Sequence, residues 1–234
     1  MRPLPTSDGQ TVGMWIFAHR GVHATRAQEN SVEAFSRAVV IGCHIETDAR
    51  CARDGGVVLA HDAFVGTVVR RKVSTMSASA LNRRGIPSID ALFDCIGSTT
   101  HVSVDLKDTS AAAGLIESAR AVDAVDRLWL VTDQLQTLER LRHQFDDVRL
   151  VHEARGAEVA DFPAHSSRLS AIGVNAQNTD VFELSHDDVC ASHAAGLLIF
   201  GSLANDRARL ERARDMTIDA IYTDRPAFAF EVLT

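Results

Sequence analysis

Residues 43–62 read CHIETDARCARDGGVVLAHD and combine a strand, a turn and a second apolar run. We expect Cys43–Asp48 to be a buried strand of a parallel sheet. The Asp-Gly-Gly sequence at 54–56 is a turn signal, because these residues tolerate the backbone conformations of tight turns. Val57–Ala60 is therefore predicted to fold back as a short hairpin, which returns His61 to the end of the strand.

Short apolar runs alternate along the rest of the chain with segments of helical period. The predicted strands are Met14–Ala18, Cys43–Asp48, His101–Lys107, Leu128–Thr132, Arg149–Glu153, Ala171–Ala176, Leu197–Ser202 and Ala220–Asp224. The predicted helices are Ser31–Ile41, Ser88–Ile96, Ser110–Val122, Gln134–His143, Ser185–Ala195 and Asn205–Arg214, with one more within 154–170 and another beginning at Pro226.

Eight strands with intervening helices predict a (β/α)8 TIM barrel with a short hairpin and a loop insertion after the second strand. A doubly wound open sheet is the alternative. No G-x-G-x-x-G follows the first strand, however, which weakens a dinucleotide-binding version of that fold. We expect a single domain over residues 1–234, because this length suits one large α/β domain and no linker or repeat is evident.

Composition narrows the class of function. Apolar residues make up 46% and charged residues 24%, as in an ordinary soluble globular protein. The net charge of -7 argues against a nucleic-acid partner. No run approaches the roughly 20 apolar residues of a membrane span, so stable membrane insertion is not expected. The N-terminus lacks a signal-peptide core, and the four cysteines form no CxxC, so we expect a cytoplasmic location. The oligomeric state stays open.

Charged residues gather at the predicted strand ends. Glu46 and Asp48 are two apart, so strand alternation points both side chains to one face. Neighbouring carboxylates repel unless a cation or proton joins them, although a pair of solvated acids is the alternative. Asp105, at the end of the third strand, would complete an oxygen site for Mg²⁺ or Ca²⁺. Arg20 and Lys107 offer positive charge to a phosphate, or salt bridges to these same acids.

This pattern resembles the glycerophosphodiester phosphodiesterase family. The matching residues follow the family's order along nearly the whole chain: His19-Arg20-Gly21, Glu29-Asn30, Ala34-Phe35, Ala38, Gly42, Ile45-Glu46, Asp48, Asp54-Gly55, His61-Asp62, Ile86-Pro87, Asp105-Leu106-Lys107, Thr223-Asp224 and Pro226. His-Arg-Gly alone would be weak evidence, whereas the ordered set with family-like spacing is specific.

The resemblance implies roles for five of these residues. His19 and His61 would be the catalytic acid and base, since imidazole titrates near neutral pH and one ring can accept a proton while the other donates. Glu46, Asp48 and Asp105 would hold one divalent metal, Mg²⁺ or Ca²⁺. The family usually has Glu at the position of Asp105, and the shorter side chain is expected to alter the position or preference of the metal.

Three further residues are considered through the same resemblance. Glu29 belongs to the family's Glu-Asn pair and is expected to orient a catalytic group, although Gln28 stands where the family usually has Pro. Phe200 is a candidate wall of the substrate site and equally a candidate core aromatic residue. Asp224 lies in a segment that resembles the family's closing motif, where the expected local role is a strand-to-helix turn.

These features predict metal-dependent hydrolysis of a glycerophosphodiester to glycerol 3-phosphate and an alcohol, with a small-molecule phosphodiester as the partner. The alcohol group, the choice between Mg²⁺ and Ca²⁺, and the nucleophile (water or a substrate hydroxyl) stay open. One alternative is a lysophospholipase D or sphingomyelinase-D-like activity. Another is a non-catalytic barrel that binds phosphorylated metabolites, which the presence of both histidines and all three carboxylates disfavours.

Overall fold

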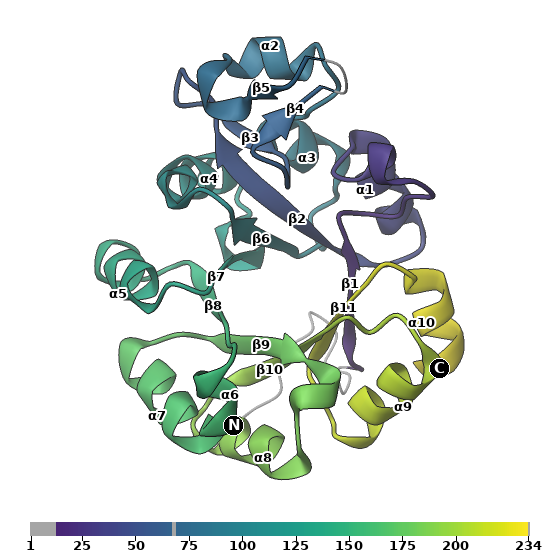
Figure 1. Cartoon of the computed structure of the whole chain (residues 1–234), viewed down its shortest axis with the longest axis vertical. Helices are drawn as coiled ribbons and strands as arrows, with labels where there is room; N and C mark the ends of the chain where they lie inside the picture. The colour runs from purple at the N-terminus through teal and green to yellow at the C-terminus, as the bar shows by residue number, and fades with distance from the viewer. Residues whose placement is uncertain (1–12, 67–68, 234) are drawn as a thin grey trace.

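The computed structural model of the chain describes residues 13–66 and 69–233. Within these residues, eight parallel strands form a barrel that closes by pairing of β1 with β2. In order around the barrel the strands are β1 (Trp15–His19), β2 (His44–Cys51), β6 (Val102–Leu106), β7 (Leu128–Thr132), β8 (Arg149–Glu153), β9 (Ala176–Asp180), β10 (Leu198–Ser202) and β11 (Ala220–Thr223). Figure 1 shows the helices outside this ring. The predicted TIM barrel is confirmed.

Several helices begin at polar caps, and the helices lie outside the barrel strands (Figure 1). They are α1 (Val32–Val40), α2 (Ala78–Asn82), α3 (Ile89–Cys95), α4 (Ala112–Ala121), α5 (Leu135–Gln144), α6 (Ala157–Ala160), α7 (Phe162–Ile172), α8 (His186–Ala194), α9 (Arg207–Asp215) and α10 (Pro226–Leu233). Ser31, Ser88, Ser185 and Asp206 each accept a backbone N–H of the first turn, which satisfies a donor that the helix itself leaves free. Among the described residues, no helix has the length and apolar character to cross a membrane.

The hairpin predicted after the second strand is confirmed. β3 (Val57–Leu59) pairs antiparallel with β2, and Gly55 takes a φ of +83° in the turn, a conformation that glycine adopts without strain. The N–H of Ala60 donates to the carbonyl of Asp48 at 2.8 Å, so the chain is back at the end of β2 just before His61. The predicted insertion follows, with β4 (Phe64–Val65), β5 (Arg71–Lys72) and α2 projecting at the top of Figure 1.

The strand predicted over Ala171–Ala176 is wrong, because α7 continues to Ile172 and β9 runs over Ala176–Asp180 instead. The sequence of β9, AQNTD, shows no alternation of apolar and polar residues. Its polar side chains can be buried because they have specific hydrogen-bond partners. Gln177 donates to Ser166 on α7 and to Ser192 on α8, both at 2.6 Å. Other side chains of β9 line the barrel mouth. Hydrogen bonds thus replace apolar burial in this strand.

The barrel interior below the mouth is filled by aromatic rings. Phe17, Trp129, Phe200 and Tyr222 belong to one buried cluster, in which the ring centroids of Phe17 and Phe200 lie 5.8 Å apart. Phe200 is fully buried. Of the two roles considered for this residue, the structure supports the core aromatic and not the substrate wall.

Two histidines close the opposite, N-terminal end of the barrel. His44 contacts the Trp15 ring edge to face, and His101 stacks on Trp15 at 4.5 Å between ring centroids. The Trp129 indole N–H donates to Nδ1 of His101 at 3.1 Å. Burial lowers the pKa of His44 to about 4 and that of His101 to about 3, because the apolar surroundings disfavour the charged ring. Both rings are therefore neutral in the folded protein at neutral pH.

We expect this pair to make the fold sensitive to acid. The pKa of each ring is lower in the folded than in the unfolded chain, so the unfolded chain binds more protons and stability falls as the pH drops from about 6.5 towards 4. Each histidine contributes a slope of up to about 1.4 kcal/mol per pH unit. Urea unfolding of a His44→Gln/His101→Gln variant should show a shallower loss of stability between pH 6 and pH 5 than the wild type. The exposed His143→Gln variant is the control, and identical slopes in all three proteins would refute the assignment.

Candidate active site

A cavity of about 450 Å³ opens at the C-terminal ends of the barrel strands. Six residues predicted to act there line it together: His19, Arg20, Glu46, Asp48, Asp105 and Lys107. They come from the ends of β1, β2 and β6, which are adjacent strands. Parallel strands bring these ends to one face of a barrel, where TIM-barrel active sites lie. The predicted common orientation of Glu46 and Asp48 is confirmed, since both line this cavity.

His19 is held between two carboxylates. Its Nδ1 donates to Asp224 at 2.6 Å, and its Nε2 lies 3.9 Å from Oε2 of Glu46. Burial alone would lower the pKa of His19, but the hydrogen bond to Asp224 and the charges of Glu46 and Asp224 outweigh it, so the pKa is raised. An imidazole whose Nδ1–H is fixed by a carboxylate presents Nε2 to the cavity, as a general acid or base requires.

Glu46 is a buried carboxylate whose negative charge has few stabilising partners. Its Oε2 accepts the backbone N–H of Arg20 at 3.0 Å, and among the described residues it forms no ion pair with a lysine or arginine. Burial raises the pKa of Glu46 to about 8, because the negative charge is poorly solvated. Such a carboxylate favours a proton or a cation nearby.

Asp48 is also buried but has three partners. Nδ2 of Asn30 donates to its Oδ2 at 3.0 Å, Nε of Arg20 forms an ion pair with the same oxygen at 3.0 Å, and Nζ of Lys107 lies 3.3 Å from Oδ1. Lys107 also contacts Asp105 at 2.5 Å and so bridges the two acids. The salt bridges considered for Arg20 and Lys107 are therefore present, and the two cations offset a cluster of three carboxylates.

The loop after β1 is shaped by residues with left-handed backbone. Arg20, Gly21 and Asn30 have φ values of +56°, +78° and +53°. A Cβ at Gly21 would lie 2.7 Å from the backbone carbon of Ala34, so only glycine fits against α1 there. Nη1 of Arg20 donates to Glu29 at 2.6 Å. Glu29 contacts Arg20 and does not line the cavity, and its expected role in orienting a catalytic group stays a prediction.

Glu46, Asp48 and Asp105 present only carboxylate oxygens, the ligand type that hard divalent cations prefer. Among the described residues, Glu46 also has no lysine or arginine partner that would compete with a metal. Within residues 13–66 and 69–233, however, these three acids do not bring one oxygen each within 4.8 Å of the others. Lys107 lies between Asp48 and Asp105, and aspartate is one methylene shorter than the glutamate usual at position 105. The three carboxylates are therefore the right kind of ligand for a divalent metal, but their oxygens do not all lie within 4.8 Å of one another.

His61 lies at the rim and does not line the cavity. Its Nδ1 contacts Asp62 at 2.9 Å, and Asp62 in turn pairs with Arg26 of the loop after β1. The hairpin thus brings His61 beside the end of β2, and its side chain is about as exposed as that of His19. The backbone carbonyl of His61 is held by Arg50 at 2.7 Å, which fixes this part of the rim.

Sequence reasoning missed the main partner of His19. Asp224 was interpreted as part of a turn, yet its carboxylate also accepts from Nδ2 of Asn205 at 2.7 Å. Arg155 and Asn178, which line the far side of the cavity, were not recognised either. The available signal was position, because Asp224 directly follows β11 and Asn178 lies two residues before the end of β9, and active-site residues of such barrels gather at the C-terminal ends of strands.

Comparison with known proteins agrees with this geometry. Residues 19–111 match the model of the Glycerophosphoryl diester phosphodiesterase family. A Mycobacterium tuberculosis protein named probable glycerophosphodiester phosphodiesterase 2 is 26% identical over 242 residues, which cover 94% of this chain and 91% of the relative. Both matches are to glycerophosphodiester phosphodiesterases, in agreement with the resemblance that the sequence carries. Members of the matched family are phosphoric diester hydrolases and generally depend on a divalent metal, which agrees with the enzyme class predicted from the sequence.

Solved structures of family members share the fold. The glycerophosphodiester phosphodiesterase of Thermotoga maritima superposes with a TM-score of 0.80 at 19% identity and covers 95% of this chain and 100% of its own. An Oleispira antarctica phosphodiesterase in complex with the product sn-glycerol-3-phosphate superposes with a TM-score of 0.78 at 16% identity, covering 94% and 96%. At these identities the similarity establishes the barrel.

Proposed function

We propose that this protein hydrolyses glycerophosphodiesters to glycerol 3-phosphate and an alcohol in a metal-dependent reaction. The observation that carries the proposal is the mouth itself, where the Asp224–His19 pair faces Glu46, Asp48 and Asp105 across one cavity. Proton transfer, charge stabilisation and a place for a cation are all needed to cleave a phosphodiester, and the cavity combines them.

His19 is proposed to transfer a proton at Nε2, because Asp224 holds Nδ1 and stabilises the charged ring when the proton arrives. Arg20 and Lys107 are proposed to contact the phosphate oxygens, since both cations line the cavity. When bound by Glu46, Asp48 and Asp105, a divalent metal would polarise phosphate oxygens and lower the cost of developing charge.

His61 is proposed to exchange the second proton at the rim. The contact between its Nδ1 and Asp62 leaves Nε2 free to face the leaving alcohol or the nucleophile. Because the ring sits outside the cavity, it is proposed to act on the alcohol side of the substrate. Glu29 is proposed to position Arg20 through their 2.6 Å contact.

One observation favours the lysophospholipase D alternative. Leu203 lines the cavity, has a φ of +59° and leaves 55% of its surface exposed at the rim. An exposed leucine there offers a contact for an acyl chain, whereas the rest of the predicted chemistry is the same for both substrates.

A substrate panel followed by phosphorus NMR tests the proposed function. Glycerophosphocholine and glycerophosphoethanolamine should both give glycerol 3-phosphate in the presence of Mg²⁺ or Ca²⁺. Turnover of lysophosphatidylcholine alone would favour the lipid alternative and contradict the proposal. No turnover of any diester, with glycerol 3-phosphate still bound, would indicate the non-catalytic barrel.

A further inference from the structure

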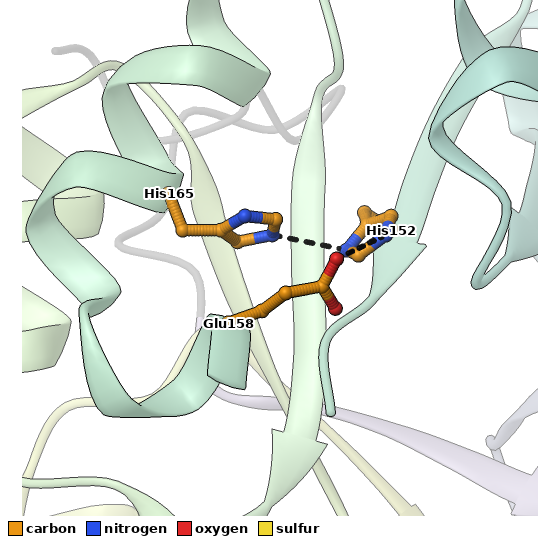
Figure 2. Close-up of side chains that lie close together, drawn as sticks. All are labelled: His152, Glu158 and His165. Atoms are coloured by element: carbon orange, nitrogen blue, oxygen red, sulfur yellow. Dashed lines mark hydrogen bonds and ion pairs between the residues drawn. The ribbon is translucent and has the colours of Figure 1, made fainter. Parts of the chain in front are cut away.

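A second cluster of metal-ligating side chains lies away from the mouth, where β8, α6 and α7 meet. Figure 2 shows His152, Glu158 and His165 pointing toward one another from these three elements. One ligand atom from each lies within 4.8 Å of the other two, the only such group of three within residues 13–66 and 69–233. His152 is fully buried and His165 is 7% exposed. Buried polar rings packed together in this way need a specific partner.

The facing nitrogens of the two rings are hydrogen-bonded at a separation close to that of two ligands of one metal. Nδ1 of His152 lies 3.1 Å from Nε2 of His165. Two nitrogens bound to one Zn²⁺ at the usual bond length are separated by about 3.3 Å in tetrahedral geometry. Nε2 of His152 faces the backbone carbonyl of Asp133 at 3.2 Å, which keeps a proton on Nε2 and leaves Nδ1 as the nitrogen that accepts from His165.

Glu158 provides the third donor from α6. Its Oε2 accepts the backbone N–H of Arg155 at 3.2 Å, and its Oε1 lies 3.8 Å from Nε2 of His152. The carboxylate is thus tied to the backbone just before α6, while one oxygen remains within 4.8 Å of the ring nitrogens. The pKa values of His152 and His165 are both lowered by burial, which favours the neutral rings that bind metals.

We propose that His152, Glu158 and His165 form a second metal site, which binds a divalent transition metal of the Zn²⁺ class on the outer side of the barrel. Imidazole nitrogens with one carboxylate suit Zn²⁺, whereas Mg²⁺ and Ca²⁺ prefer oxygen ligands alone. The site differs in chemistry from the three carboxylates at the mouth. A metal there takes the place of the hydrogen-bonding proton between the rings, which moves to Nδ1 of His165.

The metal would fix the segment that connects β8 to α7. Strand alternation places His152 on the outer side of β8 and Glu153 in the cavity, and Ala154 and Arg155 also line the cavity. A metal bound by residues of β8, α6 and α7 would therefore link the strand to both helices that follow it. The proposed role is structural, and it holds the Arg155 side of the mouth in place.

Zn²⁺ binding to the full-length protein, measured by competition with a chromophoric chelator in excess Mg²⁺, tests the site. We expect one tight Zn²⁺ per chain, an affinity loss of about 100-fold or more in His165→Gln, and a smaller loss in Glu158→Gln, since even outer partners of metal ligands contribute about 10- to 100-fold. Co²⁺ should give the visible absorption of a tetrahedral nitrogen site in the wild type only. Thermal unfolding should shift upward with Zn²⁺ in the wild type and not in His165→Gln.

Two control variants assign the result to this cluster. His143→Gln removes an exposed histidine on α5, and Glu46→Gln removes a carboxylate at the mouth; both should keep wild-type Zn²⁺ affinity. Unchanged Zn²⁺ affinity in His165→Gln, or loss in Glu46→Gln alone, would overturn the proposal. If His165→Gln does not fold, the partly exposed Glu158→Gln decides by the same comparison. The readout is binding, so it is independent of whether the protein hydrolyses a glycerophosphodiester.

Discussion

His19→Gln should lower kcat for a glycerophosphodiester by about 100- to 10,000-fold, the range that a general acid or base usually supplies. Glutamine keeps a polar side chain but cannot carry the proton that the imidazole moves at Nε2. The variant should fold normally, because His19 lies at the mouth and not in the packed layers. Asp224→Asn should also lower kcat, since an amide no longer stabilises the charged ring that the 2.6 Å contact holds.

His193→Gln is the matched control. His193 forms the same kind of pair, with its Nε2 2.8 Å from Asp219, but that carboxylate precedes β11 and lies at the other end of the barrel. Steady-state kinetics should show near wild-type kcat for His193→Gln. A kcat for His19→Gln within tenfold of this control would contradict the proposed proton transfer. His61→Ala tests the rim histidine in the same assay, and an unchanged kcat there would remove His61 from the mechanism.

Substitution of the carboxylates at the mouth is expected to have the second large effect on activity. Glu46→Gln and Asp48→Asn should each lower kcat/KM by at least about 100-fold, because metal binding contributes several kcal/mol of charge stabilisation in such reactions. Asp105→Glu should act in the opposite direction, because the longer side chain brings its oxygen closer to the other two. We expect half-maximal activity at a lower Mg²⁺ or Ca²⁺ concentration in Asp105→Glu than in the wild type.

Metal titration of activity checks these expectations. Asp108→Glu is the matched control for Asp105→Glu, because Asp108 caps the turn at Thr109–Ala111 and does not line the cavity. If Asp105→Glu requires more metal than the wild type, or if Glu46→Gln keeps wild-type kcat/KM, the assignment of these three acids is wrong.

Much of the barrel follows from short-range pattern. β7 and β8 have the predicted bounds, because Leu128–Thr132 is a compact apolar run and Arg149–Glu153 carries the apolar pair Leu150-Val151 at its centre. The hairpin at Gly55 is predictable because a turn signal separates two strand-like runs. β9 escapes this reasoning, since side chains such as Gln177 bond to neighbouring helices and hydrophobicity gives no signal there.

The site residues likewise divide into those that local sequence predicts and those that depend on the whole fold. Glu46 and Asp48 are close in sequence, so strand period alone places them on one face. The Asp224–His19 pair spans 205 positions and depends on closure of the barrel, which no local pattern reveals. Phe200 shows the converse case, because its residue type allows a core or a cavity wall and only its burial decides between them.

The most direct test of the proposed function is a phosphorus NMR time course of glycerophosphocholine with protein freed of metal by chelation and checked by elemental analysis. We expect no glycerol 3-phosphate from the metal-free protein, and its appearance after Mg²⁺ or Ca²⁺ is added, in the wild type but not in His19→Gln. Equal hydrolysis by the metal-free and the metal-restored wild type would contradict the proposed metal-dependent mechanism.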